Sequence, residues 1–158
     1  MTGYLVTEIS DIAELVRGLR RVAVLGARPE THAHKAGFFV PQALALAGIE
    51  IIPVSVHDTQ INTILGRQVY YRLADIPGPV DVVNVFRRPD QLPDHLADIL
   101  ALQPPAVWFQ SGIRNDTVAG QLAAAGIRVV QDRCLMVDHR MFTARGWDAR
   151  RSVTRIGS

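Results

Sequence analysis

The sequence has few cysteines, few lysines and no long apolar run, and each shortage excludes a class of protein. Cys134 is the only cysteine among 158 residues, so no disulfide can form within the chain and a reducing compartment is expected. The longest apolar region, Gly37 to Val54, is interrupted by Pro41, Glu50 and Pro53, which indicates a helix and a strand rather than a membrane span. The first residues also lack the basic segment and apolar core of a secretory signal. We therefore expect a cytoplasmic protein that does not contact a membrane.

Basic residues are not concentrated on the part of the chain that is expected to fold. Lys35 is the only lysine among 17 basic residues, and the net charge is only +2. Between Asp138 and Ser158 there are five arginines and two aspartates, so this segment carries +3 and the remainder is close to neutral. A nucleic-acid-binding core would carry a basic patch, so nucleic acid is not an expected partner. We expect a single domain over residues 1–136 and a basic, at most partly ordered extension over residues 137–158.

Apolar runs typical of buried strands alternate with runs that have helical spacing. Strands are predicted at residues 22–25, 50–54, 80–86, 106–110 and 127–130, with a short one at 69–71. Helices are predicted at 7–19, 38–47, 92–102 and 116–125, and about one helical turn within 57–66. This alternation predicts an α/β fold, namely a Rossmann-like, doubly wound, mainly parallel sheet of five to six strands with helices on both faces.

Local signals make these helix boundaries more specific. Ser10 or Asp11 is expected to cap the first helix, with Glu14 in the position of a capping-box partner. Pro41 requires that the second helix either begins near residue 39 or is kinked at the proline. Asp116 is expected to cap the helix that follows the fourth main strand.

The residues that follow each strand predict where a ligand binds, because ligands of open parallel sheets lie at the carboxyl ends of the strands. These ends carry four arginines, two glycines and one carboxylate. Such a cationic, glycine-containing rim suits an anionic nucleotide. The segments, in chain order, are Gly26–Ala27–Arg28–Pro29, Ser55–Val56–His57, Phe86–Arg87–Arg88–Pro89, Gln110–Ser111–Gly112–Ile113 and Asp132–Arg133–Cys134.

Several common nucleotide and catalytic motifs are absent. The first turn contains one glycine instead of G-x-G-x-x-G, and Ser55 and Val56 stand where a dinucleotide-binding protein places an acidic residue. No G-x-x-x-x-G-K-[ST] phosphate loop occurs. His32 and His34 lack further ligands for a metal. Cys134 is the only candidate nucleophile, and no general base is placed beside it by the sequence.

Several short stretches, in this order and spacing, resemble the stand-alone CoA-binding proteins, whose fold is similar to the CoA-binding domain of the succinyl-CoA synthetase α subunit. The resemblance covers residues 22–134. It rests on V-A-V-L-G-A, I-I-P-V-S, I-L-G-R-Q-V-Y, L-A-D-I-P, V-D-V-V-N-V-F-R-R-P, V-W-F-Q-S-G-I and V-V-Q-D-R-C.

The resemblance implies a Rossmann-like domain that holds coenzyme A across its strand ends. By this analogy, the turn at Gly26, Ala27, Arg28 and Pro29 would hold the phosphates, with Arg28 or Lys35 in place of the family's usual cation. Val54, Ser55 and Val56 would flank the adenine or ribose. Phe86 and Arg87 would line the middle of the site, and Gln110, Ser111, Gly112 and Ile113 the pantetheine side.

We therefore expect a binding module for coenzyme A or an acyl-CoA, with no catalytic residues and no metal. Three alternatives remain at this point: an oxidoreductase-like domain that binds NAD(P), a thiol-dependent transferase that uses Cys134, and an anion-regulated partner protein whose basic tail docks elsewhere. A protein partner or a homo-oligomer is left open.

Overall fold

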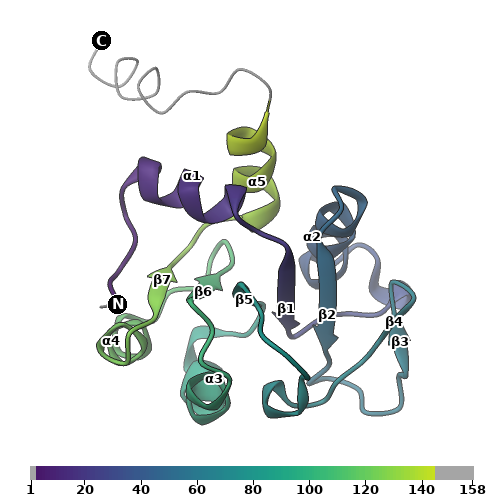
Figure 1. Ribbon diagram of the computed structural model, residues 1–158. Helices are drawn as coiled ribbons and strands as arrows, with labels where there is room; N and C mark the ends of the chain where they lie inside the picture. Colours follow the sequence, from purple (N-terminus) through teal and green to yellow (C-terminus); the bar gives the residue numbers. More distant parts are fainter. Residues whose placement is uncertain (1–2, 145–158) are drawn as a thin grey trace.

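The computed structural model describes residues 3–144 and contains a five-stranded parallel sheet in the order β2-β1-β5-β6-β7 (Figure 1). The strands are β1 (Arg21–Leu25), β2 (Glu50–Val54), β5 (Val82–Val85), β6 (Ala106–Phe109) and β7 (Arg128–Val130), and β3 (Thr63–Ile64) and β4 (Arg67–Gln68) form a separate hairpin. The α-helices are α1 (Ile9–Arg17), α2 (Ala36–Leu46), α3 (Leu96–Leu102), α4 (Asp116–Ala124) and α5 (Leu135–Thr143). Three 3₁₀ helices are η1 (Glu30–His32), η2 (Leu73–Asp75) and η3 (Pro89–His95).

The strand order locates the crevice in which a ligand can bind. The chain passes from β1 outwards to β2 and then returns to the other side of β1 to form β5, so Val24 pairs with Pro53 on one side and Asn84 on the other. The carboxyl ends of β1 and β5 therefore flank a topological switch point, which is the usual ligand site of an open α/β sheet. The prediction of a doubly wound parallel sheet with helices on both faces is confirmed.

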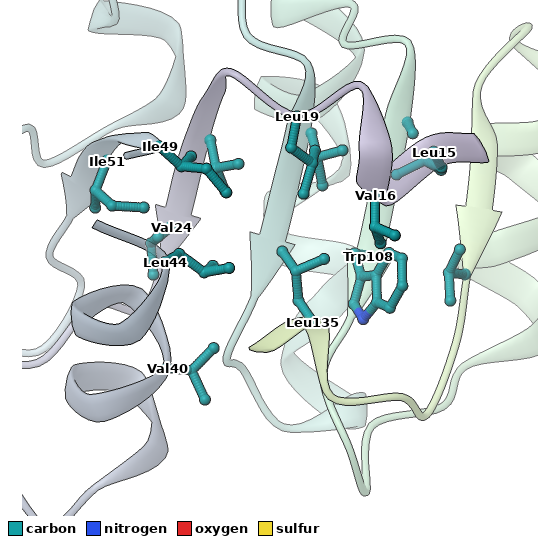
Figure 2. Packing of buried hydrophobic residues seen from close by; sticks show 14 of the residues in the cluster. Leu15, Val16, Leu19, Val24, Val40, Leu44, Ile49, Ile51, Trp108 and Leu135 are labelled. Atoms are coloured by element: carbon teal, nitrogen blue, oxygen red, sulfur yellow. The ribbon is translucent and has the colours of Figure 1, made fainter. Parts of the chain in front are cut away.

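Alternating strand residues supply two separate hydrophobic cores, one on each face of the sheet. Val24 and Trp108 face α1, α2 and α5, where Val16 and Leu135 are fully buried (Figure 2). Val82 belongs to the same cluster. The opposite set, including Leu25, Val83, Val85, Val107 and Phe109, packs with η2, α3 and α4. Because every central strand is buried on both faces, the site at the strand ends rests on a rigid base.

Both outer edges of the sheet are covered by the chain itself. Val6 donates its N–H to the carbonyl of Val129 at 2.7 Å, and Val129 donates to Tyr4 at 2.9 Å, so the N-terminal segment covers β7. At the other edge, Tyr70 donates to Pro53 and accepts from Ser55, both at 2.9 Å. These contacts occupy backbone groups of Val129 at one edge and of Pro53 and Ser55 at the other, through which an open edge strand could pair with another chain.

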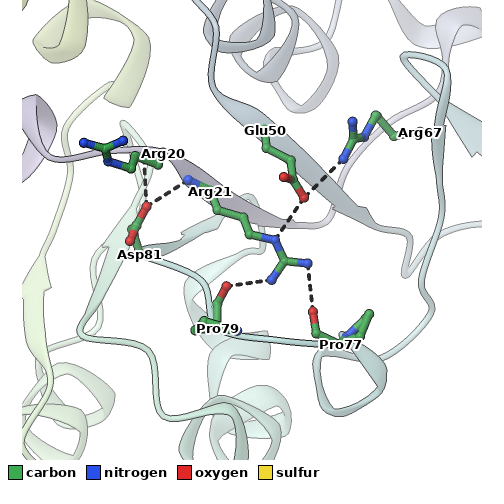
Figure 3. A network of polar contacts seen from close by, with 7 residues as sticks. All are labelled: Arg20, Arg21, Glu50, Arg67, Pro77, Pro79 and Asp81. Atoms are coloured by element: carbon green, nitrogen blue, oxygen red, sulfur yellow. Dashed lines mark hydrogen bonds and ion pairs between the residues drawn. The ribbon is translucent and has the colours of Figure 1, made fainter.

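A polar network lies at the amino end of the sheet, away from the carboxyl ends of the strands, and Figure 3 shows its contacts. The guanidinium of Arg21 donates to Glu50 at 2.9 Å, and Glu50 also pairs with Arg67 of the hairpin at 3.2 Å. The carboxylate of Asp81 accepts the backbone N–H groups of Arg20 and Arg21, each at 2.8 Å. The remaining contacts of the Arg21 guanidinium are to the carbonyls of Pro79 at 2.6 Å and Pro77 at 2.8 Å. These contacts fix the starts of β1 and β2, whose carboxyl ends border the crevice.

Several helix boundaries differ from the sequence predictions. Glu8, not Ser10 or Asp11, is the N-cap of α1, and no side chain caps this end. The helix α2 begins at Ala36, which places Pro41 in its interior rather than in its first turn. Asn115 caps α4 in place of Asp116, because its side-chain oxygen accepts the N–H of Val118 at 3.0 Å.

The structure differs from the sequence predictions in two further segments: one was given the wrong secondary structure, and one helix was not predicted. The polar segment 57–66, expected to contain a helical turn, instead leads into the β3–β4 hairpin, whose two-residue loop is Leu65–Gly66 with φ of 53° and 69°. Helix α5, which the sequence analysis did not predict, packs against α1 and buries Phe142. It spans residue 136, after which the basic extension was expected to begin, and residues 145–158 of that extension lie outside the described residues. None of the helices in residues 3–144 has the length and apolar character that a membrane crossing requires.

Candidate functional site

A cavity of about 900 Å³ lies at the carboxyl ends of β1, β5 and β6, on both sides of the switch point. The loops that follow β1, β2, β5 and β6 form its walls together with the start of α2. Ten of the fourteen residues predicted as ligand contacts line it: Gly26, Arg28, Lys35, Val56, Phe86, Arg87, Gln110, Ser111, Gly112 and Ile113. Because the carboxyl ends of parallel strands lie at one edge of the sheet, these segments line one cavity although they are far apart in the sequence.

The turn after β1 is built so tightly that only glycine fits at its first position. Gly26 has a φ of 91°, and a β-carbon there would lie 2.5 Å from the carbonyl oxygen of Phe86. The N–H groups of Gly26 and Ala27 both donate to the carbonyl of Val54, at 3.0 and 3.1 Å. The turn is thus held against the ends of both neighbouring strands, β2 and β5.

The start of α2 forms the wall next to this turn. Lys35 is its N-cap residue, and Ala36 and Gly37 line the cavity. Pro41 has no N–H to donate to the carbonyl of Gly37, four residues earlier. That carbonyl instead accepts the N–H of Arg28 at 3.1 Å, which ties the turn to the helix. The N-terminus of an eleven-residue helix therefore borders the cavity, and its dipole favours an anion there.

The charged residues of the cavity wall are all positive. Arg28, Lys35, Arg87 and Arg88 line the cavity, and no aspartate or glutamate within residues 3–144 does. In the part of the chain that the structure describes, only Arg88 of these four forms an ion pair, a 3.8 Å contact with the exposed Asp90. Uncompensated cations of this kind are suited to a ligand with several phosphates.

Burial and the positive charges of the wall lower the pKa values of neighbouring titratable side chains. Burial, then the positive charges of Arg28 and Arg87, lower the pKa of His57, which lines the cavity. Burial and the neighbouring Arg88 likewise lower the pKa of Arg87, which nevertheless stays charged at neutral pH. The Nε–H of Arg87 donates to Nε2 of His95 at 3.1 Å.

The opposite end of the cavity is polar but uncharged. Gln110 is nearly buried, and its side-chain oxygen accepts from Nδ2 of Asn84 and from the backbone N–H of Leu135, both at 3.3 Å. This oxygen therefore receives one of the free N–H groups at the start of α5. In the adjoining loop, Gly112 donates its N–H to Asp132 at 2.7 Å. The loop that follows β6 is thereby fixed to β7 and to α5.

Four of the predicted contacts do not line the cavity. Ala27, Val54 and Ser55 are buried behind the turn, and the hydroxyl of Ser55 donates to the carbonyl of Asp58 at 2.8 Å. Pro29 lies beyond the cavity wall, next to η1. Their proposed contact with a ligand is not tested by this geometry, because buried residues can still shape a site from behind.

Six lining residues were not among the predicted contacts: Ala36, Gly37, His57, Arg88, Pro89 and Gln91. His57, Arg88 and Pro89 belong to the strand-end segments, so extending each predicted contact segment by one or two residues would have included them. Ala36 and Gly37 were missed because the helix was predicted over residues 38–47, whereas α2 begins at Ala36.

The residues considered for other chemistry lie apart from the cavity wall. Cys134 is half-buried at the N-cap of α5 and does not line the cavity. His32 and His34 stack with ring centroids 6.4 Å apart. Within residues 3–144, no three His, Cys, Asp or Glu side chains come together as metal ligands would.

A family model, a curated relative and several solved structures match most of this chain. A family model described as "CoA binding domain" matches residues 20–140. Protein YneT of Bacillus subtilis (strain 168) is 36% identical over 132 residues, covering 82% of this chain and 93% of the relative. A Thermus thermophilus structure, cell-free ID.343, shares 36% identity with a TM-score of 0.78 and covers 86% of this chain and 99% of that one.

A structural likeness extends to part of a larger protein. The dinucleotide-forming acetyl-coenzyme A synthetase 1 of Ca. Korarchaeum cryptofilum is similar with a TM-score of 0.59 at 18% identity, over 74% of this chain and 27% of that one. At this identity the likeness shows the fold alone. The family match runs from β1 into α5, ending at residue 140, and includes every lining residue of the cavity. On these grounds the chain belongs to the CoA-binding domain family.

Proposed function

We propose that this chain binds coenzyme A or an acyl-CoA in the cavity at the strand ends, as a binding module without catalytic residues. The observation that carries the proposal is the wall of four cations with no carboxylate, beside a glycine turn and a helix N-terminus. Coenzyme A has a diphosphate and a 3′-phosphate, and it carries acyl groups as thioesters. A ligand with three phosphates needs several positive groups, which this wall offers.

The proposed arrangement assigns each end of the ligand to a part of the wall. The phosphates would lie near Arg28, Lys35 and the start of α2, where both the side chains and the helix dipole are positive. The pantetheine arm would extend towards Gln110 and Ile113, which are uncharged. Phe86 and Arg87 would lie between these two parts.

The cavity is a poor match for NAD. A dinucleotide site usually has a carboxylate at the end of the second strand, which accepts the ribose hydroxyls. Here the end of β2 presents Val56 and His57, and the nearby Ser55 is buried and bonded to Asp58. A carboxylate in this position would repel a ribose that carries a 3′-phosphate, so its absence favours coenzyme A.

Calorimetric titration of the full chain with coenzyme A, acetyl-CoA and NAD tests the proposal. We expect saturable binding of the first two and weak or no binding of NAD. Tight binding of NAD with no response to coenzyme A would overturn the assignment. Native mass spectrometry of the freshly purified protein provides a second measurement, since a retained nucleotide would reveal itself by mass.

A further inference from the structure

His95 lies behind the cavity wall and contacts a wall residue directly. It is the last residue of η3 and the N-cap of α3, and it does not line the cavity. Its Nε2 accepts the Nε–H of Arg87 at 3.1 Å. We propose that His95 is a positioning residue, which holds the guanidinium of Arg87 in the wall so that it can receive the phosphates of the ligand. This inference rests on the proposed function.

The contact leaves most of the guanidinium free for a ligand. Arginine has five N–H donors, and the bond to His95 uses the one on Nε, so the four on the two terminal nitrogens remain. These terminal groups form the fork that matches a phosphate. Fixing the side chain before binding also removes part of the conformational entropy that the ligand would otherwise have to offset.

A neutral imidazole can do this without cancelling the charge of the arginine. Within residues 3–144, Arg87 forms no ion pair with a carboxylate. An aspartate or glutamate in the place of His95 would also accept from Nε, but it would neutralise the charge that attracts the ligand. A histidine that accepts through Nε2 carries its proton on Nδ1 and has no charge.

The surroundings keep His95 in this neutral form. Burial and the adjacent Arg87 lower its pKa, and they outweigh the opposite influence of Asp94 and Asp98. The carboxylate of Asp98 is itself paired with Arg72 at 2.8 Å. Protonation of Nε2 would remove the acceptor and place a second positive charge next to Arg87, so the contact is made only by the neutral ring.

The backbone that carries His95 is firmly packed. Leu92, three residues before it, and Ile99, four residues after it, are both fully buried in the core under η3 and α3. The imidazole therefore comes from a fixed element, whereas Arg87 belongs to the loop that follows β5. A contact from a rigid element to a loop side chain is what positioning requires.

The decisive variants are His95→Leu, which removes the acceptor, and His95→Gln, whose side-chain oxygen can replace Nε2 without titrating. With coenzyme A, we expect His95→Leu to weaken binding about five- to tenfold, as for the loss of one hydrogen bond to a charged group. His95→Gln should stay within about twofold of the wild-type chain, because the contact to Nε is kept. In an Arg87→Ala background, His95→Leu should change nothing further, since the residue it positions is gone.

The pH dependence gives a readout that a purely structural role would not affect. Between pH 7.5 and 5.5 the wild-type chain should lose more affinity for coenzyme A than His95→Gln, in which titration of the phosphates and of His57 is unchanged. Nitrogen NMR of the ligand-free protein at pH 7.5 should show His95 protonated on Nδ1, and Arg87→Ala should raise the pKa of His95. A proton on Nε2, or equal affinity of His95→Leu and the wild-type chain, would overturn the proposal.

A second probe, inorganic pyrophosphate, separates this inference from the proposed function. Suppose that pyrophosphate binds the wild-type chain, that His95→Leu lowers the affinity for pyrophosphate, and that coenzyme A does not bind. The positioning role then stands and the assignment of coenzyme A fails. If coenzyme A binds and His95→Leu is without effect, the proposed function stands and the positioning role fails. If neither probe binds, both are wrong.

Discussion

The backbone N–H of Arg28 donates to the carbonyl oxygen of Gly37 at 3.1 Å, so the turn after β1 is bonded to the first turn of α2. This carbonyl is the one that Pro41 leaves without an intrahelical donor. The proline that interrupts the sequence pattern of the helix thereby frees an acceptor for the loop beside it. The cationic side chain of Arg28 and the helix N-terminus are held on the same side of the cavity as a result.

Replacement of Gly26 by alanine should be costly because the position combines a left-handed backbone with a close contact. The φ of 91° disfavours any side chain, and a β-carbon would lie 2.5 Å from the carbonyl of Phe86. We expect Gly26→Ala to lower the free energy of unfolding by about 3 kcal/mol, from backbone strain and overpacking together. Urea denaturation measures the loss.

Gly48→Ala is the matched control for this substitution. Gly48 has a similar φ of 95°, but apart from its two chain neighbours no residue within 3–144 has an atom within 4 Å of the place that a β-carbon would occupy, so only the backbone strain should be felt. We expect a loss of about 1 kcal/mol. Equal losses at both glycines would show that the approach to Phe86 has no energetic consequence.

Arg28 and Lys35 should contribute to the affinity for phosphates in a way that distinguishes the 3′-phosphate. If either cation contacts that group, its replacement by alanine should lower the affinity for coenzyme A about tenfold, as expected for the loss of a charge-assisted hydrogen bond. The affinity for dephospho-coenzyme A should fall much less. Arg114→Ala serves as the control, because Arg114 is exposed, pairs with Asp116 and does not line the cavity. An equal loss for both ligands would assign the cation to the diphosphate instead.

The ion pair between Arg133 and Asp138 should stabilise the junction of β7 and α5. The guanidinium donates twice to the carboxylate, at 2.6 and 2.9 Å, and Asp138 is only 3% exposed. We expect Asp138→Asn to lower the free energy of unfolding by about 2 kcal/mol, because a buried charged partner is lost. The exposed Asp90, 3.8 Å from Arg88, is the control, and Asp90→Asn should cost less than about 0.5 kcal/mol.

Stability should fall in mildly acidic solution because three histidines have lowered pKa values. Burial is the main cause at His57, His95 and His139, and each ordinarily has a pKa of 6.5. Below that pH the unfolded chain binds more protons than the folded one, so the free energy of unfolding decreases as the pH falls from 6.5 towards the lowered values. Well above 6.5, where neither the folded nor the unfolded chain binds these protons, the histidines should have no effect on stability.

His139→Gln isolates one contribution away from the cavity. Burial alone lowers the pKa of His139, so the variant should lose less stability than the wild-type chain between pH 7.5 and 5.5. Urea midpoints at pH 7.5, 6.5 and 5.5 measure this difference. Parallel curves for the two proteins would mean that His139 titrates alike in the folded and unfolded chains.

Elements with strong local patterns were predicted well from sequence, and those that depend on distant contacts were not. The five main strands are nearly continuous apolar runs because both faces are buried, and this pattern is visible without a structure. Helix α5 has weak helical periodicity of its own, and it is held by packing against α1, with Phe142 buried. The β3–β4 hairpin depends on a positive φ at Leu65, which nothing local favours in a leucine.

The candidate site, too, was predicted from the sequence only in part. A glycine after the first strand and arginines after the first and third were sufficient to predict a cationic rim, because parallel strands bring their carboxyl ends to one edge. The contact between Arg87 and His95 was not predicted, since nothing in the sequence indicates which side chain lies behind an arginine.

The order of residue types along the chain was enough to predict the fold class, the family and the sign of charge around the cavity. The fold class follows from the alternation of apolar strand runs with helical runs, the family from short matched stretches, and the charge from the residues that stand at the strand ends. The packing of the folded chain decides which residues line the cavity. That packing buries Ser55 and Val54 behind the turn and brings His57 and Gly37 into the wall. The physical reason is that burial and hydrogen bonding depend on the elements that pack against a residue, and the chain order does not specify them.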